Sequence, residues 1–309
     1  MIGRLPEAVR IREVGPRDGF QNEPEVIPTD QKVRLINLLA RTGLRRLEVT
    51  SFVRPDVIPQ LADAAQVLRY IVVPPEVDVS VLIPNERGLD NALHLREHFN
   101  EINCFLSASE THNLHNVNRS VEDSLVGLEH VIGRARTEGL RVEAVISTAF
   151  GCPYEGAVAV ERVLAIARRL IEAGAAEIGF GDTTGMANPV QVGGFFQVAR
   201  ETLGSGVELT AHFHNTRGQG LANVLAALQA GCTSFESSFG ELGGCPVPPG
   251  ATGNIATEDL VSMLEEMGVR TGVNLTFLLD AVAAMRGVLG RQLGSHTLTA
   301  GPVDWHRTR

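Results

Sequence analysis

The chain has 309 residues, of which 44% are hydrophobic and 20% charged, a composition typical of globular proteins with a large buried core. Its net charge of −9 argues against a nucleic-acid partner, which would need a basic face. No apolar stretch is long enough for a membrane span, and the first residues lack the apolar run of a signal peptide, so a cytoplasmic location is expected.

Arginine supplies almost all of the positive charge, because Lys32 is the sole lysine and falls in a predicted helix. Schiff-base aldolases, pyridoxal phosphate enzymes and Walker-type phosphate loops all need a lysine at the reacting centre. These classes are therefore excluded. The four cysteines are Cys104, Cys152, Cys232 and Cys245, and they form no Cys-x-x-Cys pair, so neither disulfides nor a cysteine-rich zinc site is expected.

Strand-like runs recur along the chain at the spacing of a βα unit. Helical patterns lie between them, and several end on a glycine, which helices prefer just after the last turn. The predicted strands are Val9–Gly15, Arg46–Phe52, Val77–Ile83, Glu101–Ala108, Val142–Ala149, Glu177–Gly181, Glu208–His214 and Ser234–Phe239. The helical patterns include Thr29–Arg41, Val121–Glu138, Val158–Ala173, Pro189–Leu203 and Leu221–Ala230.

Eight such units predict an α/β fold of the (β/α)8 TIM-barrel type. A doubly wound sheet is the alternative, but no Gly-x-Gly-x-x-Gly turn supports it. We expect a single catalytic domain, with the barrel over about 9–270 and additional C-terminal helices over about 271–309. Thr257-Glu258-Asp259 is a plausible helix start, and Leu275–Leu289 is predicted to be a terminal helix.

In a TIM barrel the chemistry lies at the carboxyl ends of the strands, so polar residues there are the site candidates. His212 and His214 end the seventh strand, and their spacing of two points both rings at the same face. Asp18 after the first strand and Asn254 beyond the eighth could add two oxygens. This mixture suits a divalent ion with open positions, Mg²⁺, Mn²⁺ or Zn²⁺. Two hydrogen-bonded strand histidines are the alternative.

Arg17 directly precedes Asp18, so the two side chains would diverge on a strand unless the turn after Pro16 reorients them. A cation at a strand end is expected to face a developing oxyanion. The alternative is an arginine that only pairs with Glu48 or Asp182.

Cys245 lies in a segment, residues 240–254, that is too rich in Gly and Pro for a helix or strand. We expect a mobile loop over the barrel mouth, where a thiol could act as acid or nucleophile; a small loop residue is the alternative. Cys104 and Cys232 are predicted to be packing residues. For Cys152 the sequence does not decide between a chemical role and a packing role.

Longer motifs resemble the 3-hydroxy-3-methylglutaryl-CoA lyase family, which belongs to a wider group of metal-dependent barrel enzymes. The similarity runs from about Val14 to Thr276. It implies a carbon–carbon lyase that cleaves a 3-hydroxy-3-methylglutaryl-CoA-like thioester to acetyl-CoA and acetoacetate. The motifs are Val14-Gly-Pro-Arg-Asp-Gly-Phe-Gln-Asn-Glu23, Thr50-Ser-Phe-Val53, Gly151-Cys-Pro-Tyr-Glu-Gly156, Gly181-Asp-Thr183 and, after the cysteine loop, Gly253-Asn-Ile-Ala-Thr-Glu-Asp-Leu260.

The resemblance also implies roles for individual residues. Arg17 would stabilise enolate charge, Glu48 and Asp182 would complete the polar site, and Cys245 would act in proton transfer. The base that removes the substrate hydroxyl proton stays open among Asp182, a histidine and a metal-bound water. The implied ligands of Mg²⁺ or Mn²⁺, or of Zn²⁺ in the isolated protein, are Asp18, His212, His214 and Asn254, and substrate contacts are expected from Arg17, Ser51, Tyr154 and Thr183.

The chain departs from the family pattern in three places. Family members usually carry Asp and an aromatic residue where this chain has Asn215 and Arg217. The segment Thr111–Ser120 is unlike that of the best-characterised lyases, and no lysine follows Gly290 for a family-like CoA phosphate contact. Arg119 and Arg217 are candidates for binding a different carboxylate or the CoA phosphates, with ordinary surface arginines as the alternative.

Several alternative functions remain. The same chemistry could act on a different 3-hydroxyacyl-CoA. A Claisen-type acyl transferase of the isopropylmalate or homocitrate synthase kind shares the His-x-His, but usually carries a further C-terminal domain. A metal hydrolase and a non-catalytic acyl-CoA-binding barrel are weaker alternatives. The expected partner is an acyl-CoA substrate, and a symmetric homodimer is the default assembly.

Overall fold

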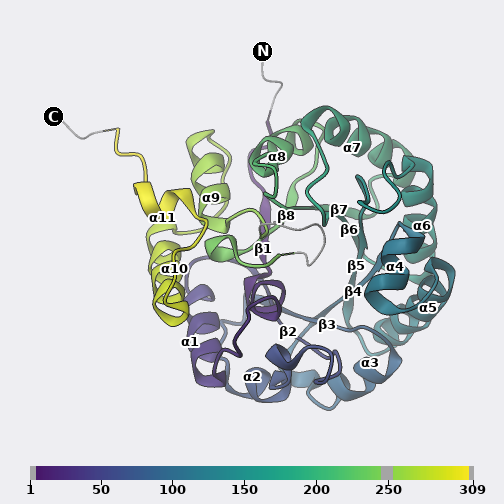
Figure 1. Cartoon of the computed structure of the whole chain (residues 1–309), viewed down its shortest axis with the longest axis horizontal. Coiled ribbons are helices and arrows are strands. Elements are labelled where there is room, and N and C mark those ends of the chain that lie inside the picture. Colours follow the sequence, from purple (N-terminus) through teal and green to yellow (C-terminus); the bar gives the residue numbers. More distant parts are fainter. Residues whose placement is uncertain (1–4, 245–252, 306–309) are drawn as a thin grey trace.

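The computed structural model describes residues 5–244 and 253–305 of the chain. Its centre is a closed barrel of eight parallel strands that follow one another in chain order, with β8 beside β1 (Figure 1). This confirms the predicted TIM barrel. The strands are β1 (Arg10–Glu13), β2 (Arg46–Ser51), β3 (Asp78–Leu82), β4 (Glu101–Ser107), β5 (Arg141–Ser147), β6 (Glu177–Asp182), β7 (Glu208–Phe213) and β8 (Ser234–Ser237).

Helices connect successive strands and form a ring outside the barrel (Figure 1). Short 3₁₀ turns at Pro59–Leu61, Arg96–His98 and Phe239–Glu241 add to the connections. The connecting helices are α1 (Thr29–Leu39), α2 (Ala64–Tyr70), α3 (Glu86–Leu93), α4 (Glu110–Val117), α5 (Val121–Thr137), α6 (Val160–Ala173), α7 (Pro189–Leu203) and α8 (Gly220–Gln229).

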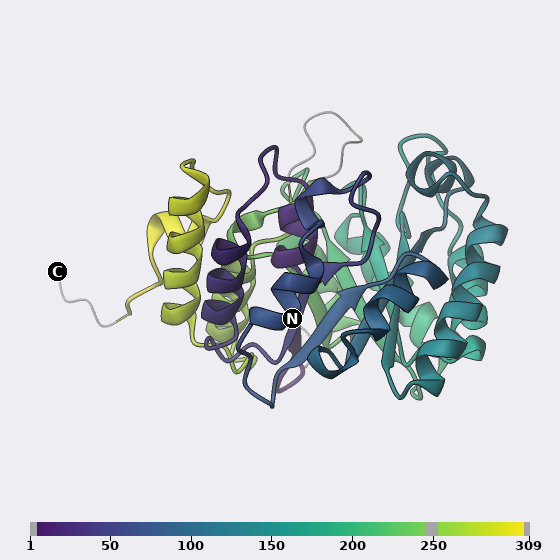
Figure 2. The same cartoon turned by 90° about the horizontal axis from the view of Figure 1, so that it is seen from below.

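The C-terminal helices complete this ring, as Figure 1 shows. Beyond β8, α9 (Thr257–Glu266) and α10 (Leu275–Leu289) lie between α8 and α1, and α11 (His296–Ala300) lies outside them. The side view shows α10 alongside α1 (Figure 2). None of the helices in the part of the chain described above is both long and apolar enough to cross a membrane.

The apolar core lies between the strands and the helix ring. On β6, Phe180 faces this layer, and its ring centroid lies 4.8 Å from that of Phe195 on α7. The alternate residues Gly179 and Gly181 turn towards the barrel interior, as the period of two in a strand requires. Side chains on the other strands alternate in the same way, so one face of every strand is buried against helices.

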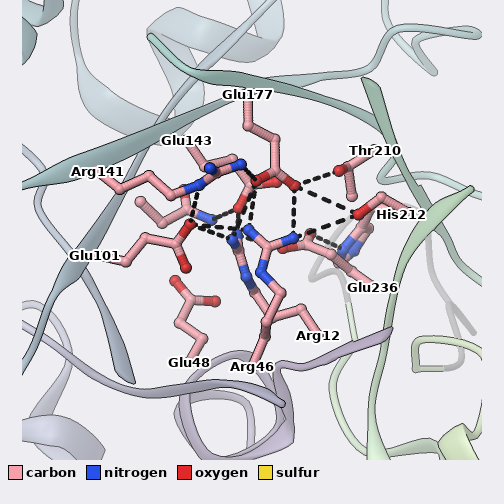
Figure 3. Close-up of polar contacts among 12 residues, drawn as sticks. Arg12, Arg46, Glu48, Glu101, Arg141, Glu143, Glu177, Thr210, His212 and Glu236 are labelled. Carbon is pink, nitrogen blue, oxygen red and sulfur yellow. Dashed lines mark hydrogen bonds and ion pairs between the residues drawn. The ribbon is translucent and has the colours of Figure 1, made fainter. Parts of the chain in front are cut away.

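The barrel interior is filled with charged side chains (Figure 3), although apolar branched residues are typical of this fold. Arg12, which is fully buried, pairs with Glu101 at 2.9 Å, with Glu236 at 3.4 Å and also with Glu143. Arg46 pairs with Glu101 at 2.8 Å and with Glu177. Burial alone would lower the pKa of Arg12, but the carboxylates outweigh it, so this pKa is raised and the guanidinium stays charged.

Candidate active site

A cavity of about 1040 Å³ opens at the carboxyl ends of the strands, where the fold predicts the chemistry. Six of the predicted site residues line it: Arg17, Asp18, Tyr154, Thr183, His212 and His214. Two more lie directly behind them, since Glu48 contacts Arg17 and Asn254 contacts Asp18. The structure therefore brings residues from both ends of the chain together at one place.

Arg17 and Asp18 sit on a tight π-helical turn, Gly15–Gly19, that directly follows β1. The turn packs so closely that a Cβ at Gly15 would lie 2.4 Å from the ring of Phe239. Arg17 Nη1 donates a hydrogen bond to Asp18 Oδ1 at 2.9 Å. The turn thus makes two consecutive side chains converge that would diverge on a strand.

Asp18, His212 and His214 form a group suited to a metal ion. All three are buried, and each offers one ligand atom within 4.8 Å of the others. The Nε2 atoms of the two histidines face each other at 3.1 Å. Asn254 donates to Asp18 Oδ2 at 2.7 Å, while its own buried Oδ1 accepts no hydrogen bond from the described residues. Two imidazole nitrogens, a carboxylate and an unsatisfied amide oxygen fit a divalent cation.

Glu236, on β8, contacts the His212 ring at Nδ1, the nitrogen that does not face His214. His212 Nδ1 lies 2.8 Å from Glu236 Oε2. An ionised carboxylate can only accept, so Nδ1 donates to it, and in the neutral ring Nε2 is then the nitrogen with a lone pair for a metal. Glu236 was not predicted as a site residue. Its signal in the sequence is a charge in the middle of the predicted strand Ser234–Phe239.

Arg17 is held between two carboxylates. Its Nε and Nη2 lie 2.9 and 2.8 Å from Glu48 Oε2, so Arg17 makes the pair with Glu48 that the alternative named, and its role towards an oxyanion stays a prediction. Burial raises the pKa of Glu48 to about 7, although Arg17 opposes the rise. Burial would also raise the pKa of Asp18, but Arg17 and the two histidines outweigh it, and that pKa is lowered. Asp18 therefore stays ionised, as a ligand must.

Two predicted residues, Asp182 and Ser51, are not among those that line the cavity. Asp182 Oδ1 accepts hydrogen bonds from the backbone amides of Met186 and Ala187 at 2.8 and 3.0 Å. Burial raises the pKa of Asp182 to about 7. Ser51 Oγ accepts from the amide of Val53 at 3.1 Å. Both side chains therefore support turns, and their roles in catalysis or substrate binding stay predictions.

Aromatic rings line another part of the cavity. Tyr154 stacks on His115 of α4, with ring centroids 4.8 Å apart, and lies 6.5 Å from the ring of His112. Thr183 Oγ1 accepts from the amide of Thr148 at 3.2 Å. The two histidines were not predicted as site residues, although they fall in Thr111–Ser120, the segment that departs from the family pattern.

The structure separates the two arginines that the sequence left open. Arg119 lines the cavity. Arg217 instead donates to the carbonyl oxygens of Thr184 and Gly185 at 3.0 and 2.7 Å, so it holds the loop after β6. Asn215 donates to Glu241 at 3.0 Å.

The cysteines fall into two groups. Cys104 and Cys232 are fully buried, which confirms the prediction that they are packing residues. Cys152 is also buried, and its Sγ accepts from the amide of Tyr154 at 3.4 Å. Cys245 and its expected loop lie outside the described residues.

The fold and the site define a barrel enzyme with a candidate metal centre, and comparison with known proteins gives the family. The family model described as HMGL-like matches residues 8–285. The chain is 46% identical to the hydroxymethylglutaryl-CoA lyase of Bacillus subtilis, over 95% of this chain and 97% of that protein. It is 41% identical to the mitochondrial hydroxymethylglutaryl-CoA lyase of Bos taurus, over 97% of this chain and 91% of that protein.

A solved structure is similar to this chain in both fold and sequence. The lyase from Acinetobacter baumannii in complex with coenzyme A and 3-methylmalate has a TM-score of 0.92 and 40% identity, and 98% of each chain is covered. The chain belongs to the HMGL-like family, and it is an enzyme of the carbon–carbon lyase class. The hydroxymethylglutaryl-CoA lyases depend on a divalent metal, and the group of Asp18, His212 and His214 could hold one here.

Proposed function

We propose that this chain cleaves 3-hydroxy-3-methylglutaryl-CoA to acetyl-CoA and acetoacetate, the reaction that gives its relatives their name. The observation that carries the proposal is the convergence of Asp18, His212 and His214 beside Arg17 in one cavity. We assign Asp18, His212, His214 and Asn254 as the ligands of a divalent cation, with Mg²⁺ or Mn²⁺ as the expected ion. A cation held there would act as a Lewis acid towards substrate oxygens.

Arg17 supplies a second, fixed positive charge. Bond cleavage leaves negative charge on the oxygen of the thioester enolate, and that charge needs a partner that is already in place. Glu48 and Asp18 hold the guanidinium from two sides, and its side chain is 11% exposed, so it reaches the cavity without leaving its bonds. Arg17 therefore needs little rearrangement to stabilise the enolate.

Two proton transfers frame the bond cleavage. A base removes the substrate hydroxyl proton, and an acid returns a proton to the enolate carbon. We assign the role of this acid to the thiol of Cys245. Asp182 has a pKa of about 7, which suits a base at neutral pH. Its Oδ1 accepts from the amides of Met186 and Ala187, whereas its buried Oδ2 accepts no hydrogen bond from the described residues and is the oxygen left to take a proton.

A different 3-hydroxyacyl-CoA is the second candidate substrate. The observation that favours it is the wall formed by His112, His115 and Tyr154, since both histidines belong to the segment Thr111–Ser120. A homodimer and a cytoplasmic location stay predictions.

The test is incubation of the purified protein with 3-hydroxy-3-methylglutaryl-CoA and Mg²⁺ or Mn²⁺, with a chelator-treated control. Acetyl-CoA and acetoacetate are followed by mass spectrometry. Metal-dependent formation of both supports the proposal. Free CoA without acetyl-CoA would indicate a hydrolase instead, and the absence of all three products from a metal-loaded protein would reject this acyl group.

A further inference from the structure

Asp182 ends β6, and its two carboxylate oxygens have different surroundings. Oδ1 accepts hydrogen bonds from the amides of Met186 and Ala187 at 2.8 and 3.0 Å. Oδ2 is buried and accepts no hydrogen bond from the described residues. The carboxylate is therefore oriented by the loop after β6, residues 183–188, and the direction of Oδ2 depends on how firmly that loop is held.

The loop between β7 and α8 contacts the loop after β6. Arg217 Nη1 donates to the carbonyl oxygens of Thr184 and Gly185 at 3.0 and 2.7 Å. This nitrogen carries two hydrogens, so it can bond both carbonyls at once. A Cβ at Gly185, whose φ is 58°, would lie 2.6 Å from the Cβ of Thr216. A glycine at this position therefore allows the two loops to approach closely.

Two further contacts hold the loop after β6. The buried Asn223, on α8, donates from Nδ2 to the carbonyl oxygen of Ala187 at 3.3 Å. On the other side, Thr184 Oγ1 donates to the carbonyl oxygen of Gly151 at 3.3 Å. Gly151 begins the segment that carries Tyr154 in the cavity wall. The loop is thus tied to neighbours on both sides, which limits its freedom to move.

Arg217 itself lies away from the substrate cavity. Its side chain is not among those that line the cavity, unlike Arg17 and Arg119. Within the described ranges, both hydrogen bonds that its guanidinium donates go to the loop after β6. Burial raises the pKa of Asp182, and Arg217 is one of the groups that oppose this rise. The guanidinium is therefore near enough to favour the ionised carboxylate as well as to hold the loop.

We propose that Arg217 is a positioning residue: it fixes the loop after β6 and, through the amides of Met186 and Ala187, orients Asp182. The inference rests on the proposed function, because it takes Asp182 as a group that moves a proton in the reaction. It gives Arg217 a role different from both that the sequence left open, a ligand for a substrate anion and an ordinary surface arginine.

Hydrogen exchange tests the hold on the loop without any turnover. The amides of Met186 and Ala187 are protected by their bonds to Asp182. In Arg217→Ala they should exchange about 3- to 30-fold faster, because a loop that has lost two hydrogen bonds opens more often. Exchange is measured by mass spectrometry on fragments that cover residues 182–188. Fragments from β3, across the barrel, should exchange as in the wild type.

Steady-state kinetics test the effect on the reaction. Arg217→Ala should lower kcat about 5- to 50-fold and change KM less than about twofold, because a displaced reacting group slows the chemical step while the cavity wall stays intact. Arg217→Lys keeps a cation with several donors, so it should recover part of the lost kcat. An unfolding curve confirms that each variant is folded at the assay temperature.

Arg200→Ala is the matched control. Arg200 Nη1 also donates to two backbone carbonyl oxygens, those of Gly204 and Val207, at 2.9 and 3.0 Å. These carbonyls precede β7, so they lie at the amino end of the barrel, away from the site. The variant should keep the wild-type exchange of residues 182–188 and the wild-type kcat.

Unchanged exchange in Arg217→Ala would overturn the inference, and so would faster exchange with an unchanged kcat. An equal loss of kcat in Arg200→Ala would also overturn it, because the loss would then come from general destabilisation. A higher KM with an unchanged kcat would make Arg217 a substrate contact instead. A wild type without lyase activity would count against the proposed function alone, since the exchange result still decides whether Arg217 holds the loop.

Discussion

His212 Nδ1 lies 2.8 Å from Glu236 Oε2, and the other oxygen of that carboxylate lies 3.4 Å from Arg12 Nη1 (Figure 3). One carboxylate therefore joins the candidate metal ligand to the charged interior of the barrel. A carboxylate behind a ligating histidine fixes its tautomer and ring orientation. The buried ion pairs next to Glu236 would thus support the orientation of His212 as a metal ligand.

We predict that Glu236→Ala weakens the binding of Mn²⁺ about 10- to 100-fold, the usual effect of removing such a supporting partner. Glu236→Gln should lose less, because an amide oxygen can still accept from His212 Nδ1. The measurement is a titration of metal-free protein with Mn²⁺, followed by the electron paramagnetic resonance signal of the free ion.

The control for this prediction is Glu143→Gln. Glu143 also pairs with Arg12, but it makes no hydrogen bond to a histidine among the described residues. It should therefore lower stability and leave Mn²⁺ affinity nearly unchanged. Equal losses of affinity in the Glu143 and Glu236 variants would show a general loosening of the barrel instead of a specific support.

Replacing Arg12 tests how much the buried ion pairs of the barrel interior contribute to stability. Arg12→Met leaves several buried carboxylates without their cation, and breaking a buried pair in this way costs about 3–5 kcal/mol. We expect the free energy of unfolding in urea to fall by that amount. Arg45→Ala is the matched control, since the pair of Arg45 with Glu76 is largely exposed and should contribute less than about 1 kcal/mol. A loss in Arg12→Met no larger than in the control would mean that the network adds little to stability.

The sequence predicted the barrel because each strand is a short apolar run followed by a long helical pattern. The connecting helices that it missed, α2, α3 and α4, have only 7, 8 and 8 residues, so each contains about two turns of apolar period. The predicted first strand ran to Gly15, but β1 ends at Glu13 because Gly15 and Pro16 begin the π-helical turn. That turn depends on contact with Phe239, which is distant in the chain.

The group of candidate metal ligands was predictable because its members follow the strand ends, where barrel topology alone brings them together. Glu236 and Arg12 lie within strands, and nothing local shows whether such a charge faces the helices or the interior. Their pairing could have been inferred from the charges shared by several predicted strands.

Replacing Asp18 tests the proposed assignment of the metal ligands. Asp18→Ala removes one ligand and the partner of both Arg17 and Asn254, so metal-dependent turnover should fall by at least about a thousandfold. Gln21→Ala, which removes a hydrogen bond to Asp18 but no predicted ligand, should keep most activity. Turnover is measured with added Mg²⁺ after chelator treatment. Full activity of Asp18→Ala under those conditions would defeat the assignment.

Cys245 is predicted to act as the acid that protonates the enolate. A serine hydroxyl is a far weaker acid than a thiol, so Cys245→Ser should slow turnover by orders of magnitude. Mn²⁺ affinity should stay nearly unchanged, because the thiol is not among the predicted ligands. Both quantities are measured on the same preparation. Equal turnover by the variant would make the thiol a packing residue.

Asp182 allows its charge to be tested apart from its hydrogen bonds. In Asp182→Asn the amide oxygen can still accept from Met186 and Ala187, but the group no longer ionises. Burial raises the pKa of Asp182 to about 7 from its usual value near 4. Between these values the unfolded chain releases a proton that the folded chain keeps, so the wild type loses stability as pH rises through this window.

The variant lacks this loss, so its stability relative to the wild type should increase from pH 4.5 to pH 7.5 and then level off. Urea unfolding at four pH values measures the free energy of unfolding of both proteins. A difference between variant and wild type that stays constant with pH would show that Asp182 does not titrate in this range. Turnover gives the independent reading. If Asp182 is the base, kcat/KM of the wild type rises through pH 7 and the variant is inactive, whereas an active variant leaves the proton to another group.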